Sequence, residues 1–129
     1  MLKAKPFVKW AGGKGSLISQ LVESLPHDFA VQQNITYIEP FVGGGAVLFD
    51  ILSKYDLDDI YISDINAELI NTYVIVRDHI EELIKFLKKY QLEYVPLETE
   101  ARKSYYITRR ERFNDLKVNG NETENLKVS

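Results

Sequence analysis

YIEPFVGGGAVLFDIL, the stretch from Tyr37 to Leu52, decides the predicted fold. The apolar residues before it and at its start predict a short buried strand at 35–38, and the spacing of apolar residues predicts a helix over 46–54. Three consecutive glycines, 43–45, predict a turn between them. A glycine turn that joins a strand to a helix commonly binds a phosphate or a nucleotide-like cofactor. The stretch therefore predicts a ligand-binding turn, and Glu39 in front of it bears on which ligand is bound.

A second predicted strand, 60–63, completes a βαβ unit, and Asp64 follows it directly. Two strands joined by a helical crossover are parallel, so Glu39 and Asp64 should meet at the carboxyl edge of the sheet. Parallel sheets normally contain more strands, with both faces covered, and the sequence offers only two convincing ones. We therefore predict an α/β fold, the N-terminal portion of a doubly wound, Rossmann-like domain.

Three further helices are predicted from apolar residues at helical spacing. The first follows Ser16, a suitable N-cap, and is closed by Pro26. The second is one long helix over 69–87. The third spans 98–114, after a break at Pro96.

Composition narrows the class of protein. The 129 residues suit one domain, and the absence of cysteine excludes disulfides and cysteine-based zinc sites. No apolar run approaches the roughly 20 residues of a membrane span, so we expect a cytoplasmic protein without a membrane or metal partner. The net charge of −3 does not favour a nucleic-acid binder, which more often carries a basic excess.

Three ligands compete for the glycine turn. Gly43 and Gly45 match two positions of the dinucleotide fingerprint G-x-G-x-x-G, but Leu48 occupies the third. A P-loop is excluded, because neither glycine cluster fits G-x-x-x-x-G-K-[ST]. S-adenosylmethionine has no phosphate; its sulfonium and amino groups suit Glu39, and its ribose hydroxyls suit Asp64. The two acids favour this third ligand.

Purely structural interpretations remain open for the same residues. The glycines could serve a tight turn with close helix packing. Asp64 could be the N-cap of a helix that begins near Asn66, a role compatible with ligand binding.

Three segments in this order, PFVKWAGGKGSLISQL, YIEPFVGGGAVLFDIL and ISDINAELINTYVIVRD, together resemble the N-terminal part of the Dam-like adenine-specific DNA methyltransferases. The resemblance covers roughly residues 6–114 and implies an S-adenosylmethionine-dependent methyltransferase fold. It also implies a cofactor site at matching positions. Lys14 would pair with the cofactor carboxylate and Trp10 would offer an apolar or cation–π face, although core packing and a solvated lysine are the alternatives. The remaining implied contacts are the methionine end (Glu39, Phe41, Gly43), the ribose (Asp64) and the adenine ring (Ile65).

One motif of that family is absent from the sequence. The family's catalytic motif is an acid or Asn, then Pro-Pro, then an aromatic, which holds a flipped adenine. The four prolines of this chain, at positions 6, 26, 40 and 96, are never adjacent. We therefore expect no catalytic residue here and interpret the chain as an N-terminal, cofactor-binding fragment that is inactive alone.

The later stretch SYYITRRERFN is similar to the start of the family's DNA-recognition region. Its basic residues could contact DNA phosphates, with equal weight given to a solvated helix face. The candidates are Arg109, Arg110 and Arg112, with Arg102 and Lys103 nearby.

These features predict the organisation and the function together. We expect 1–92 to belong to the cofactor-binding domain, 93–118 to begin the DNA-recognition region and 119–129 to be a disordered polar tail. The complete enzyme would methylate the exocyclic amine of adenine in double-stranded DNA, with the missing C-terminal half as a possible partner. The alternatives are a non-catalytic cofactor- or DNA-binding fragment, a relic of a split gene and, less well supported, a nucleotide-binding oxidoreductase domain.

Overall fold

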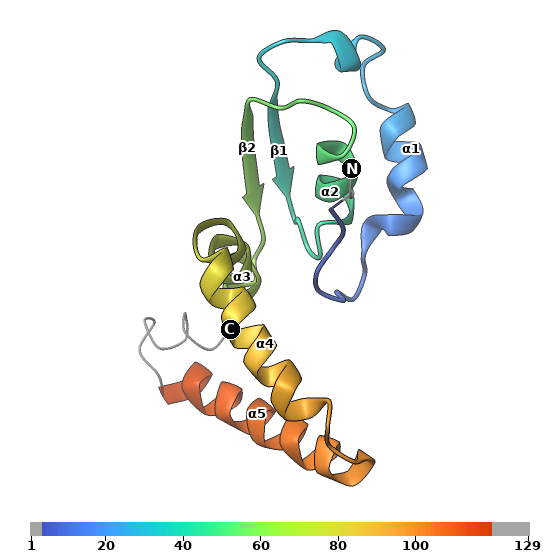
Figure 1. Ribbon diagram of the computed structural model, residues 1–129. Coiled ribbons are helices and arrows are strands. Elements are labelled where there is room, and N and C mark those ends of the chain that lie inside the picture. Colours follow the sequence, from blue (N-terminus) through green and yellow to red (C-terminus); the bar gives the residue numbers. More distant parts are fainter. Residues whose placement is uncertain (1–3, 120–129) are drawn as a thin grey trace. The chain divides into compact units, whose positions relative to one another are not determined.

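The computed structural model of the chain describes residues 4–119, which divide into two compact units. The first unit ends at Asn66 and the second begins at Ala67, and each is described by itself (Figure 1). The first contains η1 (Lys14–Leu17), α1 (Ile18–Glu23), η2 (Phe29–Val31), β1 (Thr36–Pro40), α2 (Ala46–Leu52) and β2 (Asp59–Ser63). The second contains α3 (Ala67–Asp78), α4 (Ile80–Tyr94) and α5 (Thr99–Asn119).

The predicted βαβ unit is confirmed. Strands β1 and β2 are parallel, with Thr36 beside Asp59 at one end and Pro40 beside Ser63 at the other. The backbone N–H of Val42 donates to the carbonyl of Ser63 at 2.9 Å, so the pairing continues past β1. Both strands therefore end at the same edge, where the glycine turn begins.

The core of the first unit lies between the sheet and α2. Leu48 and Ile51 of α2 are buried, as are Ile35 and Val42 at the two ends of β1. Leu48 stands where a dinucleotide fingerprint needs its third glycine, and its burial shows that this position serves apolar packing. The βαβ unit is held by this core and does not need that glycine.

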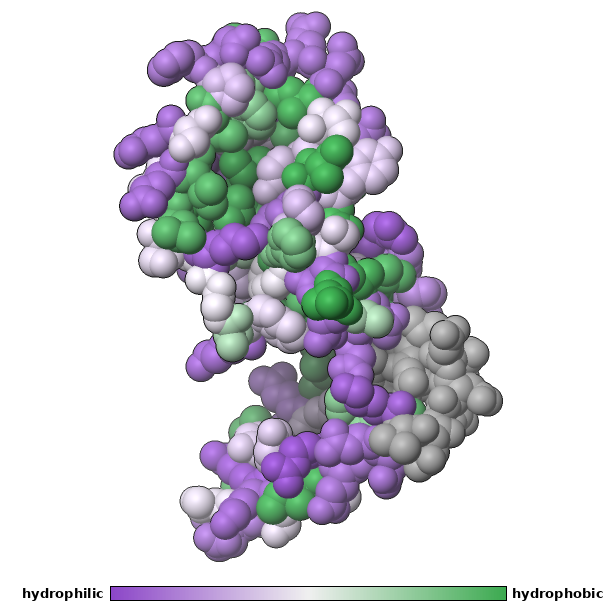
Figure 2. Space-filling model, turned by 180° about the vertical axis from the view of Figure 1, so that it is seen from behind, coloured by the Kyte–Doolittle hydropathy of each residue, from purple (hydrophilic) through white to green (hydrophobic). Residues whose placement is uncertain are grey.

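Within the first unit, the other face of the two-stranded sheet carries exposed side chains. Ile38 and Tyr61 are paired in register, so both point to the same face, and they are 67% and 59% exposed. Figure 2 shows further apolar side chains gathered on the surface of this unit, in the upper part of the view. Parallel sheets are normally covered on both faces, and the described residues form only the two strands that the sequence predicts.

The described residues of the second unit form three helices and the short connections between them. Leu69, Tyr73 and Ile75 of α3 are buried. An ion pair of 2.8 Å joins Glu68 of α3 to Lys117 of α5. The Tyr94 and Tyr105 rings of α4 and α5 lie with their centroids 5.9 Å apart, so these two helices are packed through aromatic side chains.

The prediction of one long helix over 69–87 is wrong. α3 ends at Asp78 and α4 begins at Ile80, because His79 has φ −133° and ψ 32°, outside the helical region. No glycine or proline marks the break, and the apolar residues keep their helical spacing across it. The third helix also runs farther than predicted, to Asn119.

The predicted N-cap of the first helix is also wrong. Ser16 lies inside the short 3-10 helix η1, and α1 begins only at Ile18, with Leu17 in the N-cap position and no side-chain cap. The chain enters this helix through a tighter turn, which uses backbone hydrogen bonds in place of a serine hydroxyl. The boundary expected near residue 92 stays a prediction, and residues 120–129 of the expected tail lie outside the described residues.

Within residues 4–119, no helix has both the length and the apolar character needed to cross a membrane. These residues also contain no cluster of three His, Cys, Asp or Glu side chains that could hold a metal ion.

Candidate functional site

A cavity of about 360 Å³ lies at the carboxyl edge of the sheet in the first unit. Its walls come from the N-terminal stretch 6–14, the glycine turn and the end of β2. Six of the seven predicted cofactor residues line it: Trp10, Lys14, Glu39, Phe41, Gly43 and Asp64. The fold thus brings together side chains that stand up to 54 positions apart (64 minus 10) in the sequence.

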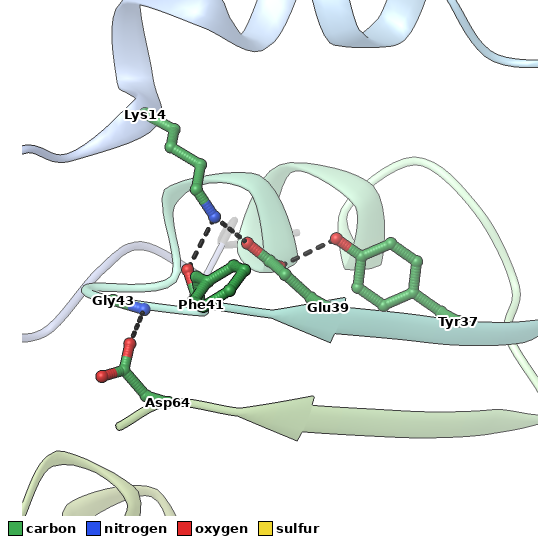
Figure 3. Close-up of polar contacts among 6 residues, drawn as sticks. All are labelled: Lys14, Tyr37, Glu39, Phe41, Gly43 and Asp64. Carbon is green, nitrogen blue, oxygen red and sulfur yellow. Dashed lines mark hydrogen bonds and ion pairs between the residues drawn. The ribbon is translucent and has the colours of Figure 1, made fainter. Parts of the chain in front are cut away.

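Glu39 is the only buried charged side chain among the described residues, at 5% exposure. Its Oε1 accepts a hydrogen bond from Lys14 Nζ at 3.2 Å, and its Oε2 accepts one from the Tyr37 hydroxyl at 2.8 Å (Figure 3). Lys14 Nζ also donates to the Phe41 carbonyl at 2.6 Å. Burying a carboxylate is costly unless it is paired, and these two donors provide the pairing.

Tyr37 is the residue of this network that the sequence reasoning missed. Burial, reinforced by the hydrogen bond to Glu39 and by its negative charge, raises the pKa of the Tyr37 phenol well above its ordinary value. The phenol therefore stays protonated and acts as a donor. The signal was available, because residues two apart on a strand point to the same face.

Asp64 joins the end of β2 to the glycine turn. Its Oδ2 accepts a hydrogen bond from the backbone N–H of Gly43 at 3.0 Å (Figure 3). Its Oδ1 accepts one from the backbone N–H of Asn66, also at 3.0 Å. These bonds, that of Asn66 first, lower the pKa of the Asp64 carboxyl, and the charge of Lys14 lowers it further. Helix α3 begins at Ala67, so Asn66 and not Asp64 occupies the position directly before it.

Trp10 packs against the glycine turn. A Cβ on Gly43 would come within 3.3 Å of Trp10 Cδ1, and one on Gly44 within 3.2 Å of Trp10 Cβ and 3.3 Å of the Val8 carbonyl. Gly43 also has φ +53°, a conformation that favours glycine. Close packing is therefore one reason for these glycines. It coexists with ligand binding, since Trp10 is 40% exposed and lines the cavity.

Phe41 has φ +66°, which is unusual for a residue with a large side chain. Phe41 is 72% exposed and lines the cavity, and its carbonyl accepts the Lys14 hydrogen bond. Strained backbone of this kind tends to occur at ligand sites, where the surrounding structure holds it in place. The seventh predicted residue, Ile65, is 97% exposed and does not line the cavity.

The predicted DNA-contacting arginines have different environments in the second unit. Arg109 donates to Glu93 at 3.0 Å, and its guanidinium lies over the rings of Tyr90 and Tyr105, 5.1 and 4.8 Å from their centroids. It therefore links α4 to α5. Arg110 and Arg112 are exposed, and Arg110 lies over the Tyr106 ring at 5.8 Å. The interpretation as a merely solvated helix face therefore does not describe Arg109.

Comparison with known proteins identifies the family. Residues 10–128 match the family of D12 class N6 adenine-specific DNA methyltransferases, and the chain belongs to this family. It is 42% identical over 125 residues to Type II methyltransferase M.MjaIII of Methanocaldococcus jannaschii, a match that covers 97% of this chain and 43% of that protein. The predicted resemblance is thus confirmed.

Two further relatives are named DNA adenine methylase. That of Vibrio cholerae is 33% identical, with 88% of this chain and 36% of the relative covered. That of Escherichia coli is 35% identical, with 86% and 35% covered. The chain therefore spans less than half the length of each of these relatives. No solved structure matches it.

Proposed function

We propose that this chain is the S-adenosylmethionine-binding part of an adenine-specific DNA methyltransferase. The observation that carries the proposal is the cavity at the carboxyl edge of β1 and β2, where open α/β sheets bind their ligands. The cavity is lined by Glu39 and Asp64 against the single cation Lys14, so these charged groups together favour a ligand with positive charge. Membership in a methyltransferase family supports the same ligand.

The lining residues fit the parts of this cofactor. Asp64 would accept hydrogen bonds from the ribose hydroxyls, and Glu39 would face the cationic methionine end. Lys14 would hold the carboxylate, and the rings of Trp10 and Phe41 would offer apolar walls. When bound, the cofactor supplies an electrophilic methyl group, which the exocyclic amine of adenine accepts in the overall reaction. Loss of a proton from the amine and release of S-adenosylhomocysteine balance that transfer.

Calorimetric titration of the 129-residue chain with S-adenosylmethionine tests the site. Asp64→Ala should weaken binding by about tenfold or more, because a hydrogen bond to a charged group contributes about 1.5–3 kcal/mol. Asp59→Ala is a matched control, since Asp59 is an exposed acid at the other end of β2. Equal affinity of the Asp64 variant and the unmodified chain would refute the assignment.

Ile65 tests the adenine end of the proposed site separately. Because its side chain is 97% exposed, Ile65→Ala should leave the free energy of unfolding unchanged. If Ile65 packs on the adenine ring once the cofactor is bound, the same variant should bind adenosine several-fold more weakly. Unchanged adenosine affinity would remove Ile65 from the site and leave the remaining residues in place.

We propose further that methyl transfer requires a polypeptide segment that this chain does not contain. The adjacent prolines that hold the flipped adenine in the resembled family are absent from the sequence. The purified chain should therefore bind cofactor without methylating double-stranded DNA. Transfer of a tritiated methyl group from cofactor to DNA by the chain alone would contradict this.

DNA contact is proposed for Arg110 and Arg112, which are exposed, and not for Arg109, which is held by Glu93. A side chain that contacts a phosphate contributes about one ion to the salt dependence of binding. Arg112→Ala should lower the slope of log K against log salt by about one in a fluorescence-anisotropy titration with duplex DNA. Lys88→Ala, on the exposed surface of α4, provides the comparison, and equal slopes for the two variants would exclude the contact.

A further inference from the structure

Tyr37 and Glu39 lie two residues apart on β1, so their side chains project from the same face of the strand. The Tyr37 hydroxyl donates to Glu39 Oε2 at 2.8 Å, and Lys14 Nζ donates to Oε1 at 3.2 Å. Each carboxylate oxygen thus has one donor, and the two donors approach from different sides (Figure 3). The orientation of the carboxylate is fixed by both contacts together.

The two donors differ in what a ligand can do to them. Lys14 lines the cavity and also donates to the Phe41 carbonyl, so an anionic group of a ligand can compete for it. Tyr37 is not among the residues that line the cavity, and its hydroxyl contacts Glu39 instead. We therefore expect a bound ligand to compete for Lys14 and to leave the hydrogen bond from Tyr37 to Glu39 in place.

The protonation of Tyr37 supports this distinction. Burial of the phenol, together with its hydrogen bond to Glu39, raises the pKa of Tyr37 above its ordinary value, so the hydroxyl stays protonated and donates to the carboxylate. Glu39 is 5% exposed, and the Tyr37 hydroxyl supplies one of the hydrogen bonds that a buried carboxylate needs in place of water.

We infer that Tyr37 is a positioning residue, which holds the Glu39 carboxylate in the orientation that faces the cationic methionine end of the ligand. The inference rests on the proposed function. It assigns to Tyr37 a part in selecting ligands that carry an ammonium or sulfonium group over neutral nucleosides. Tyr37 acts through Glu39 and has no contact with the ligand itself.

The test compares two ligands with one variant, Tyr37→Phe, which removes only the hydroxyl. S-adenosylmethionine carries the cationic amino-acid end, and 5′-methylthioadenosine has the same nucleoside without an amino acid or positive charge. Calorimetric titration should show S-adenosylmethionine bound about tenfold more weakly by the variant, since the lost bond has a charged acceptor. The affinity for 5′-methylthioadenosine should remain within twofold of that of the unmodified chain.

Tyr61→Phe is the matched control, because this substitution also removes a single hydroxyl and Tyr61 lies on the opposite, exposed face of the same sheet. It should leave the affinity for both ligands unchanged. Glu39→Gln should reproduce the selective loss, and adding Tyr37→Phe to Glu39→Gln should cause little further loss.

Equal weakening of both ligands by Tyr37→Phe would show a general structural role and overturn the inference. Unchanged binding of both ligands would also overturn it, while the proposed function would stand. If the unmodified chain binds neither ligand, the proposed function fails and the inference falls with it. A selective loss for the cationic ligand supports both.

Discussion

Alanine substitutions in the glycine turn can separate backbone conformation from packing against Trp10. Gly43 has a positive φ and would also place a Cβ 3.3 Å from the Trp10 ring. Gly44 has no positive φ, but its Cβ would contact Trp10 Cβ and the Val8 carbonyl at 3.2 and 3.3 Å. Gly12 has φ +75° with open space around it. Gly43 therefore combines both factors, Gly44 tests packing alone, and Gly12 tests backbone conformation alone.

The expected magnitudes follow from these environments. A left-handed backbone costs a non-glycine residue about 1–2 kcal/mol. Replacing glycine with alanine also lowers the entropy of the unfolded chain, which stabilises the folded state by about 0.4–1 kcal/mol. Gly12→Ala should thus destabilise by about 0.5–1 kcal/mol. Gly43→Ala adds a contact with a half-exposed ring and should cost about 1–2 kcal/mol. Gly44→Ala forces an overpacked contact that includes backbone and should cost about 1 kcal/mol or more.

Urea unfolding followed by tryptophan fluorescence measures the free energy of unfolding of each variant. The signal reports on the glycine turn, because Trp10 is the only tryptophan and packs against that turn. Gly15→Ala is the control, since Gly15 has neither a positive φ nor a neighbour within 4 Å, and alanine there should be neutral or slightly stabilising. If Gly43→Ala and Gly44→Ala unfold at the same urea concentration as Gly15→Ala, the turn does not depend on glycine, and the packing argument is refuted.

Two further predictions concern titration. The Asp64 carboxyl should titrate below its ordinary pKa of 3.8 because the backbone N–H groups of Asn66 and Gly43 favour its charged form. The contribution of this carboxyl to the free energy of unfolding should be complete above pH 3.8 and lost as the pH falls through the lowered pKa. Carbon-detected NMR measures the pKa of Asp64, and the Asp64→Asn variant identifies its signal. In the second unit, Tyr105→Phe should raise the lowered pKa of Glu93, since the hydrogen bond from Tyr105 is its largest cause. An unmoved Glu93 titration in that variant would contradict the contact.

The sequence predicts where the two acids of the site lie, because strands and the residues at their ends can be recognised from local patterns. Glu39 lies near the end of a recognisable strand and Asp64 directly follows another, and parallel strands place their carboxyl ends together. The WAGGK segment that begins at Trp10 has no such geometric signal. The family resemblance implies that this segment belongs to the cofactor site, and in the structure residues of both segments line one cavity.

The features that were missed depend on tertiary packing. The apolar spacing of α3 and α4 runs unbroken across His79, so periodicity alone predicted a single helix. Arg109 reads as surface charge in the sequence, but Glu93 and two tyrosine rings hold it between helices. In the sequence Tyr37 is an ordinary strand residue, and only the structure shows that its hydroxyl donates a hydrogen bond to Glu39.

The left-handed backbone of Phe41 has a consequence for directed evolution of this protein. Glycine at position 41 would relieve a φ of +66° and remove a ring that is 72% exposed, so selection for heat resistance alone should favour it. The same exchange would delete an aromatic wall of the cavity. A library screened only for survival on heating would therefore enrich variants that have lost part of the ligand site, and a round of selection on ligand capture is needed to retain Phe41.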